Sequence, residues 1–352
     1  MSCYSPMKGF VVGETPKGKR QLKITSYEVE GLWKHDGKFI EFDKETFRNL
    51  PLSVRPEDIY QECVTIPCGS CFGCRLDYAK SWSDRCMIEL QEHEQSWFVT
   101  FTYDDFHLPV SQWVDDDGVI HDVATLVKSD LSDTIKRIRS RLDYKYGDAA
   151  PHIKFYAAGE YGSMTLRPHY HCIIFGLPLD DLELYTVRDG YCLYNSKFMD
   201  DVWQHKGHVV VGEVTPESVS YTARYVVKKL YGNLAEVYKR YNVLPEFTLM
   251  SRRPAIAKEY FQKNIDRIYK FDKLNIRTPK GGLKIKPPRY YDKLYDIEYP
   301  NDMLMIKEAR KQNALHRELM MLEQTSLSYL ELLRVEEESR LSSARLSERR
   351  EL

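Results

Sequence analysis

Two strand-like segments joined by a short connection constrain the fold of this chain more than any other feature. Residues 152–160 and 169–176 are rich in apolar and aromatic side chains, and residues 161–168 connect them. This pattern predicts a β-hairpin. We therefore expect an α+β fold with a central antiparallel sheet and flanking helices. Further strands are predicted at 23–29, 97–103 and 207–213, and helices at 76–93, 126–142, 215–231 and 303–352.

The second strand of this hairpin carries a His-x-His pair. Residues i and i+2 of a strand point to the same face, so His169 and His171 can share a divalent cation. Glu160 ends the first strand, and its carboxylate would complete a two-histidine, one-carboxylate site that suits Mg²⁺ or Mn²⁺ acting on a phosphate. His152 and His208 flank predicted strands and are alternative third ligands. Ordinary surface or core histidines are the other interpretation of the pair taken alone.

The helix predicted after residue 215 carries two tyrosines. Tyr221 and Tyr225 are four residues apart, so both phenols lie on one helix face, and Lys228 and Lys229 follow within about one turn. A phenol has a pKa of about 10 and needs activation before it acts as a nucleophile. A nearby lysine and a cation-bound phosphate would supply that activation. Tyrosines at this spacing are also common in core packing, which is the alternative for this pair.

Basic residues are concentrated in one part of the chain. The 352 residues have a formal net charge of −1, yet residues 251–293 contain 13 Lys and Arg against 4 Asp and Glu. Such an excess is typical of a phosphate-binding surface, although a solvated basic face has the same composition. No apolar run has the length of a membrane helix, and no secretory signal is visible. The candidate DNA-binding residues are Arg252, Arg253, Lys258, Lys284, Lys286 and Arg289.

Three cysteines, Cys68, Cys71 and Cys74, are separated by two residues each. With Cys63 or Cys86 as a fourth thiolate, they would suit a tetrahedral structural zinc site. Iron–sulfur clusters use similar runs, but the sequence indicates no redox task. Buried free thiols in a loop are the alternative.

The order of these motifs resembles that of the HUH endonuclease superfamily. Residues 98–103 are similar to its first motif, 168–171 to the second and 225–228 to the third. The turn at 159–162 resembles the segment that brings the third metal ligand in several viral members. Within the superfamily the chain is most similar to the replication initiators of gokushoviruses, small single-stranded-DNA phages of the microvirus family. The segments that carry this closer resemblance are 68–75, 167–176, 221–229 and 247–254.

This resemblance implies an HUH architecture of the ferredoxin or RRM-like kind and a metal-dependent nicking reaction. One tyrosine would attack a DNA phosphodiester and stay joined to the 5′-phosphate, which leaves a 3′-hydroxyl for the host polymerase. The second tyrosine would cut the regenerated site after a round of rolling-circle synthesis. The implied partners are single-stranded DNA at the phage origin and the host replication helicase and polymerase, in the cytoplasm of a bacterial host. No P-loop pattern is present, so a fused helicase is not expected.

The motifs together suggest a division of the chain into four segments. An HUH endonuclease domain is expected at 61–260, with its cysteine-rich loop at 63–74. In this domain the tyrosine helix should lie across the front of the sheet, and the 76–93 helix should dock at the side. The other segments are an N-terminal one of unclear role at 1–60, a basic DNA-contacting one at 261–300 and a helical C-terminal tail at 301–352.

Two other functions stay open at this point. A zinc-stabilised DNA-binding protein without catalysis would explain the cysteines and the basic residues. It would leave the arrangement of Glu160, His169, His171 and Tyr225 unexplained. A related HUH transposase or relaxase would share the motifs, but relaxases tend to carry three histidines, and single-strand transposases are usually shorter with one tyrosine.

Overall fold

The chain forms two compact units. The structure, a computed structural model, describes residues 3–348 except 17, 19, 52, 53, 163, 189, 229–234, 279 and 280. The side chains of 225–228 and 345–348 also lie outside this description. We call Tyr78–Glu308 the sheet unit, and Met1–Asp77 together with Ala309–Leu352 the terminal unit. The four-segment division expected from the sequence stays a prediction.

A seven-stranded antiparallel sheet is the centre of the sheet unit. The strands are β7 Ser96–Thr102, β10 Lys154–Tyr161, β11 Pro168–Phe175, β12 Leu182–Arg188, β13 Tyr191–Ser196, β14 Val209–Glu213 and β15 Phe247–Met250. They follow the order β12-β13-β14-β7-β11-β10-β15, and every neighbouring pair is antiparallel. The predicted hairpin is confirmed as β10 and β11. The expected α+β class with a central antiparallel sheet is also confirmed.

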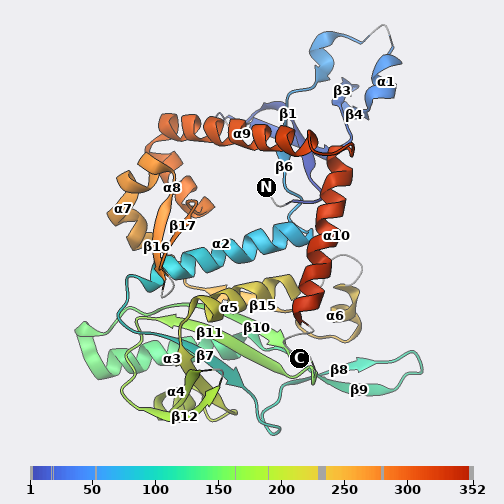
Figure 1. Ribbon diagram of the computed structural model, residues 1–352. Coiled ribbons are helices and arrows are strands. Elements are labelled where there is room, and N and C mark those ends of the chain that lie inside the picture. The colour runs from blue at the N-terminus through green and yellow to red at the C-terminus, as the bar shows by residue number, and fades with distance from the viewer. Residues whose placement is uncertain are drawn as a thin grey trace. The chain divides into compact units, whose positions relative to one another are not determined.

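Helices cover both faces of this sheet (Figure 1). On one side, which we call the back face, lie α3 Lys128–Tyr146 and α4 Lys197–Trp203; on the other, the front face, lie α2 Phe72–Leu90, α5 Pro216–Lys228 and α7 Lys258–Phe271. Alternation along β11 explains the two layers. Its residues Tyr170, Cys172 and Ile174 enter the back-face cluster, whereas Ile173 and Phe175 enter the front-face cluster.

Helix α2 differs from its prediction in both start and place. It begins at Phe72, and β6 occupies Cys63–Ile66, so the segment 63–74 is not one loop. Its position at the side of the sheet was also predicted wrongly, because its apolar stripe packs in the front-face cluster. Burying such a stripe requires an apolar partner surface, which the front of the sheet provides. The fully or nearly buried residues of this stripe are Ala79, Cys86, Met87 and Ile88.

Smaller elements complete the sheet unit. The hairpin β16 Leu274–Thr278 and β17 Gly281–Ile285, with α8 Arg289–Glu298, contributes buried residues to the front-face cluster. The predicted basic segment is therefore folded and not a loose tail. The remaining elements are the hairpin β8 Val110–Val114 and β9 Ile120–Ala124, a 3-10 turn at Gly147–Ala149, and α6 Glu236–Arg240.

The terminal unit combines both ends of the chain. Strand β1 Met7–Glu14 lies between β2 Arg20–Ser26 and β6, and β3 Gly31–His35 lies between β4 Lys38–Phe42 and β5 Ile59–Tyr60. Its core is small, with Phe10, Val29 and Leu32 as the buried hydrophobic cluster. The other elements are α1 Lys44–Arg48, a 3-10 turn at Pro56–Asp58, the end of α9 Pro300–Leu322, and α10 Tyr329–Glu348.

The last two helices confirm the prediction of a helical C-terminal tail for the residues that the structure describes. Neither they nor any other described helix has an apolar stretch long enough to span a membrane.

Candidate active site

Strand register brings Glu160 and the histidine pair together on the front face. Glu160 of β10 lies directly opposite His169 of β11, and His171 follows two residues later on the same face. The Oε1 atom of Glu160 is 2.6 Å from Nε2 of His169 and 3.4 Å from Nε2 of His171. The three side chains named from the sequence as metal ligands are thus neighbours in the fold.

Two members of this group are withdrawn from water. Glu160 is 2% exposed and His171 is 7% exposed. Burial by itself raises the pKa of a carboxyl group, but hydrogen bonds and positive charge from His169 and His171 outweigh it and lower the pKa of Glu160 to about 2. The carboxylate is therefore ionised at neutral pH and offers anionic oxygen atoms to a cation.

The outer nitrogen of each imidazole is held by another group. Nδ1 of His169 lies 3.2 Å from the carbonyl oxygen of Arg167, and because a carbonyl oxygen only accepts, Nδ1 donates its proton in this contact. Nδ1 of His171 lies 3.0 Å from Oγ1 of Thr100 on β7. Both Nε2 atoms consequently face Glu160.

This donor set fits a divalent cation. When Nδ1 carries the proton of a neutral imidazole, Nε2 presents a lone pair, and a lone pair facing a carboxylate needs a proton or a cation between them. One ligand atom from each of Glu160, His169 and His171 lies within 4.8 Å of the other two. Two imidazoles and one carboxylate leave coordination positions open for a phosphate oxygen and water. The alternative ligands His152 and His208 are exposed and lie outside this group.

Tyr221 of α5 lies beside the ligand group. Its ring centroid is 5.3 Å from that of His171, with the ring planes at 72°. On the same imidazole Phe98 of β7 stacks at 5.4 Å and 11°. Tyr221 is 42% exposed, so its phenol is accessible to a macromolecular ligand. The predicted hydroxyl cap of this helix is confirmed, because Ser218 N–H donates to Oγ1 of Thr215 at 3.1 Å.

The second predicted tyrosine, Tyr225, lies one turn further along α5. Its side chain and that of Lys228 are outside the described part of the structure, and Lys229 is outside it altogether. The roles given to these three residues stay predictions.

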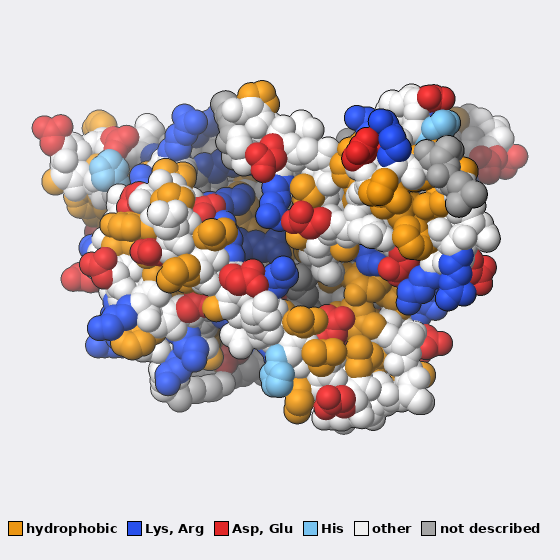
Figure 2. Space-filling model, turned by 90° about the horizontal axis from the view of Figure 1, so that it is seen from above, with side chains coloured by type: hydrophobic (Ala, Val, Ile, Leu, Met, Phe, Trp, Pro, Cys, Tyr) orange, Lys and Arg blue, Asp and Glu red, His pale blue; other side chains and the backbone are white. Residues whose placement is uncertain are grey.

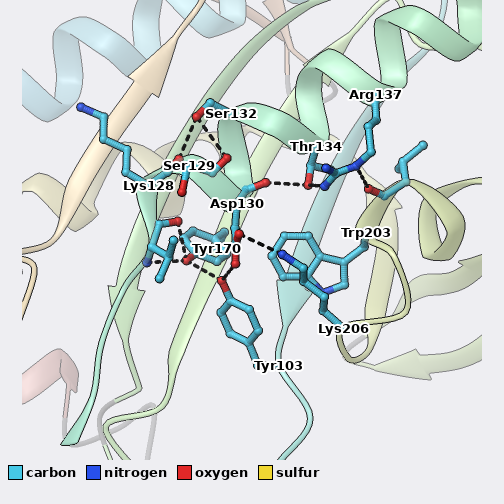
Figure 3. A network of polar contacts seen from close by, with 12 residues as sticks. Tyr103, Lys128, Ser129, Asp130, Ser132, Thr134, Arg137, Tyr170, Trp203 and Lys206 are labelled. Atoms are coloured by element: carbon cyan, nitrogen blue, oxygen red, sulfur yellow. Dashed lines mark hydrogen bonds and ion pairs between the residues drawn. The ribbon is translucent and has the colours of Figure 1, made fainter. Parts of the chain in front are cut away.

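The residue between the two histidines fastens β11 from behind. Figure 3 shows Tyr170 and Tyr103 meeting at Asp130, in the first turn of α3. The Tyr170 hydroxyl donates to the carbonyl oxygen of Val127 and accepts from its N–H, both at 2.9 Å. Lys206 pairs with Asp130 at 2.8 Å. Burial raises the pKa of Tyr170 to about 12, so its hydroxyl keeps its proton and its position as a donor.

The cysteine cluster contains a residue that sequence reasoning missed. Cys68, Cys71 and Cys74 are together, but their fourth neighbour is Cys3. Cys63, which we expected there, is exposed on β6 and outside the group, and Cys86 is buried in the front-face cluster of the sheet unit. Burial raises the pKa of the thiols of Cys3 and Cys74. It does so for Cys68 as well, but hydrogen bonds from the backbone and the Ser70 hydroxyl lower the pKa of Cys68 to about 6.

The six residues predicted to bind DNA are all exposed, and none forms an ion pair with another described residue. One of them, Lys284, lines a cavity of about 370 Å³ together with Arg267 and Lys273. Figure 2 shows Lys and Arg side chains in several groups among acidic and hydrophobic ones, in keeping with the net charge of −1. Their part in DNA binding stays a prediction.

Two further residues of the site, Thr100 and Phe98, were not singled out from the sequence. Both lie in the predicted strand at 97–103 and alternate onto the face of the histidines. Alternation alone would have placed them on one face. Their contact with His171 depends on β7 being the neighbour of β11, which no local pattern shows.

Residues 96–230, which include the strands and helix of this site, match the model of a family of replication-associated proteins that is named after ORF2. The chain is 37% identical to "Replication-associated protein ORF2" of Spiroplasma virus 4, over 71% of this chain and 74% of that protein. It is 34% identical to "Replication-associated protein VP4" of Bdellovibrio phage phiMH2K, over 66% of this chain and 68% of that protein. A third relative, "Replication-associated protein ORF4" of Chlamydia phage 1, is 27% identical over 69% and 59%. No solved structure is significantly similar to the chain.

Proposed function

The chain belongs to the family of phage replication-associated proteins, and on that premise we propose that it is a DNA-nicking replication initiator. In this proposal it cuts one strand at the phage origin and becomes joined to the 5′-phosphate through a tyrosine. It thereby starts and ends rolling-circle replication of a small circular single-stranded genome. The sheet unit would then have the HUH endonuclease architecture that the motifs suggest.

The observation that carries the proposal is the position of Tyr221 beside Glu160, His169 and His171. An exposed phenol ring 5.3 Å from the ring of His171 is within reach of a phosphate held at the ligand group. Holding the nucleophile and the phosphate in one place removes much of the entropic cost of bringing them together. This arrangement supports a phosphate-transfer enzyme more than a DNA-binding protein without catalysis.

The proposed nicking step conserves bond energy. The phenol oxygen attacks phosphorus, the new O–P bond forms as the P–O3′ bond breaks, and the phenol proton ends on the released 3′-oxygen. Glu160, His169 and His171 would hold a divalent cation, Mg²⁺ or Mn²⁺, which polarises the phosphate oxygens when bound. The phosphotyrosine keeps the energy of the phosphodiester, so a DNA 3′-hydroxyl can later attack it and restore the DNA bond.

Two tyrosines suit a reaction that cuts twice. Tyr221 and Tyr225 are four residues apart on α5, a spacing that places two side chains on one helix face. While one phenol is joined to DNA, the other would cut the regenerated origin. Lys228 and Lys229 would stabilise the negative charge that develops on the phenol oxygen.

The DNA strand would be held by phosphate contacts from exposed basic residues. We assign this role to Arg252, Arg253 and Lys258, and to Lys284, Lys286 and Arg289 in the segment 261–300. The partners in this proposal are origin DNA and the host replication helicase and polymerase, in the cytoplasm of the infected bacterium.

A covalent-adduct assay tests the proposal. Purified protein is mixed with labelled single-stranded origin DNA and Mn²⁺, denatured and separated on a gel, beside Tyr221→Phe, Tyr225→Phe and the double variant. We expect a metal-dependent protein–DNA band that only the double variant loses completely. Tyr144→Phe is the matched control, because Tyr144 is 95% exposed on α3 at the back face.

Failure has a distinct signature in this assay. If wild-type protein binds the origin DNA but forms no adduct with any divalent cation, the nicking mechanism is wrong. The zinc-stabilised DNA-binding protein then becomes the better interpretation. An adduct that survives in the double variant would move the nucleophile to another residue.

A further inference from the structure

Four cysteine thiols converge where the chain begins and where α2 begins. One Sγ atom from each of Cys3, Cys68, Cys71 and Cys74 lies within 4.8 Å of the other three. The separation is 4.0 Å between Cys68 and Cys74 and 3.9 Å between Cys71 and Cys3. All four are free thiols, since a disulfide would bring two sulfur atoms to about 2.05 Å.

These separations match a tetrahedral site for one metal ion. A zinc–sulfur bond is about 2.3 Å long, and the edge of a tetrahedron is about 1.6 times the distance from centre to corner, so neighbouring thiolates should be about 3.8 Å apart. The two closest pairs lie within a few tenths of an ångström of that value. With four thiolates from the protein, no coordination position remains open for a substrate, which is the arrangement of a structural site.

Backbone N–H groups are directed at the sulfur atoms. The N–H of Cys71 donates to Cys68, that of Cys68 to Cys3, and that of Tyr4 to Cys71, each at 3.3 Å. The N–H of Cys74 also donates to Cys71, at 3.5 Å. Hydrogen bonds of this kind favour the thiolate, which is the form that binds metal. Four thiolates around Zn²⁺ leave a net negative charge, and these donors offset it.

The terminal unit needs such a link more than the sheet unit does. Its buried hydrophobic cluster consists of Phe10, Val29 and Leu32, with a few partly buried neighbours. A core this small contributes little to the free energy of folding, and small folds commonly add a metal site for that reason. A metal at the four cysteines would join residue 3 to the start of α2, 65 residues further along the chain.

We propose that Cys3, Cys68, Cys71 and Cys74 bind one zinc ion that fastens the N-terminal residues to the start of α2 and stabilises the terminal unit. Soft thiolate ligands in a closed tetrahedron select zinc over the hard cations Mg²⁺ and Mn²⁺. The site is separate from the Glu160 group and does not depend on the nicking reaction.

Metal analysis of the full-length protein tests this inference. The His169→Ala/His171→Ala variant serves as the parent, because it removes the other metal-binding group and leaves the cysteines intact. After extensive dialysis we expect one zinc per chain, released when the thiols are modified. Replacement by cobalt should give the intense visible absorption of a tetrahedral cobalt–thiolate site.

Cys3→Ser in this parent is the critical variant, and Cys63→Ser is its matched control. Cys63 is an exposed thiol on β6 of the same unit, outside the cluster. In a chelator competition Cys3→Ser should bind zinc at least about 100-fold more weakly, because one of four ligands is lost. Cys63→Ser should match the parent. If Cys3→Ser retains full affinity, or if Cys63→Ser loses it, the assignment of Cys3 is wrong.

Alkylation of the parent protein keeps the test decisive if Cys3→Ser does not fold. Mass spectrometry should find Cys3, Cys68, Cys71 and Cys74 protected with zinc bound and reactive after chelation, whereas Cys63 reacts in both states. A parent protein that carries no metal, or iron in place of zinc, overturns the proposal. So does protection that includes Cys63 and omits Cys3.

Discussion

Thr100→Val should weaken metal binding at the proposed active site without unfolding the protein. Thr100 lies directly opposite His171 across β7 and β11, and its Oγ1 atom is 3.0 Å from Nδ1 of that histidine. This contact holds the imidazole on the side away from Glu160, so that Nε2 faces the carboxylate. Valine has nearly the same shape as threonine and removes only the hydrogen bond.

The expected magnitude follows from the burial of His171. A hydrogen bond contributes about 0.5–1.5 kcal/mol net, and a buried polar atom left without a partner costs about 1–3 kcal/mol. His171 is 7% exposed, so water replaces the hydroxyl poorly. A loss of about 1.4–2.7 kcal/mol corresponds to about 10–100-fold in affinity. Groups that hold a metal-ligating histidine typically have effects of about this size.

A Mn²⁺ titration of adduct formation measures this loss, and calorimetric titration of Mn²⁺ checks it without DNA. Thr102→Val is the matched control, because Thr102 lies on the same strand and its hydroxyl donates to the carbonyl oxygen of His208 at 2.9 Å, away from the ligand group. We expect the control to titrate like wild type. Equal titrations for Thr100→Val and wild type, or equal losses in both variants, would refute the reasoning.

Two other predictions concern the strands that hold the ligands. The pKa of Glu160 is lowered to about 2, against about 4.3 for an unperturbed Glu, so its pairing with the imidazoles stabilises the metal-free fold above about pH 4.3 and is lost as the pH falls toward 2. Glu160→Gln should therefore flatten the curve of unfolding free energy against pH in that window, and an unchanged urea-unfolding profile between pH 2 and 6 would contradict it. Tyr170→Phe should cost about 1–3 kcal/mol in urea unfolding, because both backbone groups of Val127 lose a partner; stability equal to wild type would mean that water replaces the hydroxyl.

The parts of the site that could be predicted from sequence depend on short-range patterns. Alternation over 152–160 and 169–176 places His169 and His171 on one face, and the short connection puts Glu160 on the neighbouring strand. The start of α5 was equally visible, because a hydroxyl cap followed by proline is a local signal. In each case the decisive contacts join residues that are close in the chain.

The parts that could not be predicted depend on contacts between distant segments. Cys3 joins Cys68 across 65 residues, and no spacing rule connects an isolated cysteine near the start of a chain to a later cluster. Thr100 meets His171 across 71 residues, and that contact requires β7 to lie beside β11. The front-face position of α2 is a similar case, since an apolar stripe shows that a helix is buried but not against which surface.

The alternation of β11 also separates two ways in which the proposed enzyme can fail. His169 and His171 face the reaction side, while Tyr170 between them is fastened to Val127 and Tyr103 on the back face. Metal ligands need positions held to a few tenths of an ångström, and adjacent strands fastened from behind provide such positions. The nucleophile is on α5 instead, where Tyr221 is exposed to a large ligand. Tyr170→Phe should therefore shift the Mn²⁺ titration, whereas Tyr221→Phe should reduce adduct formation and leave the titration unchanged.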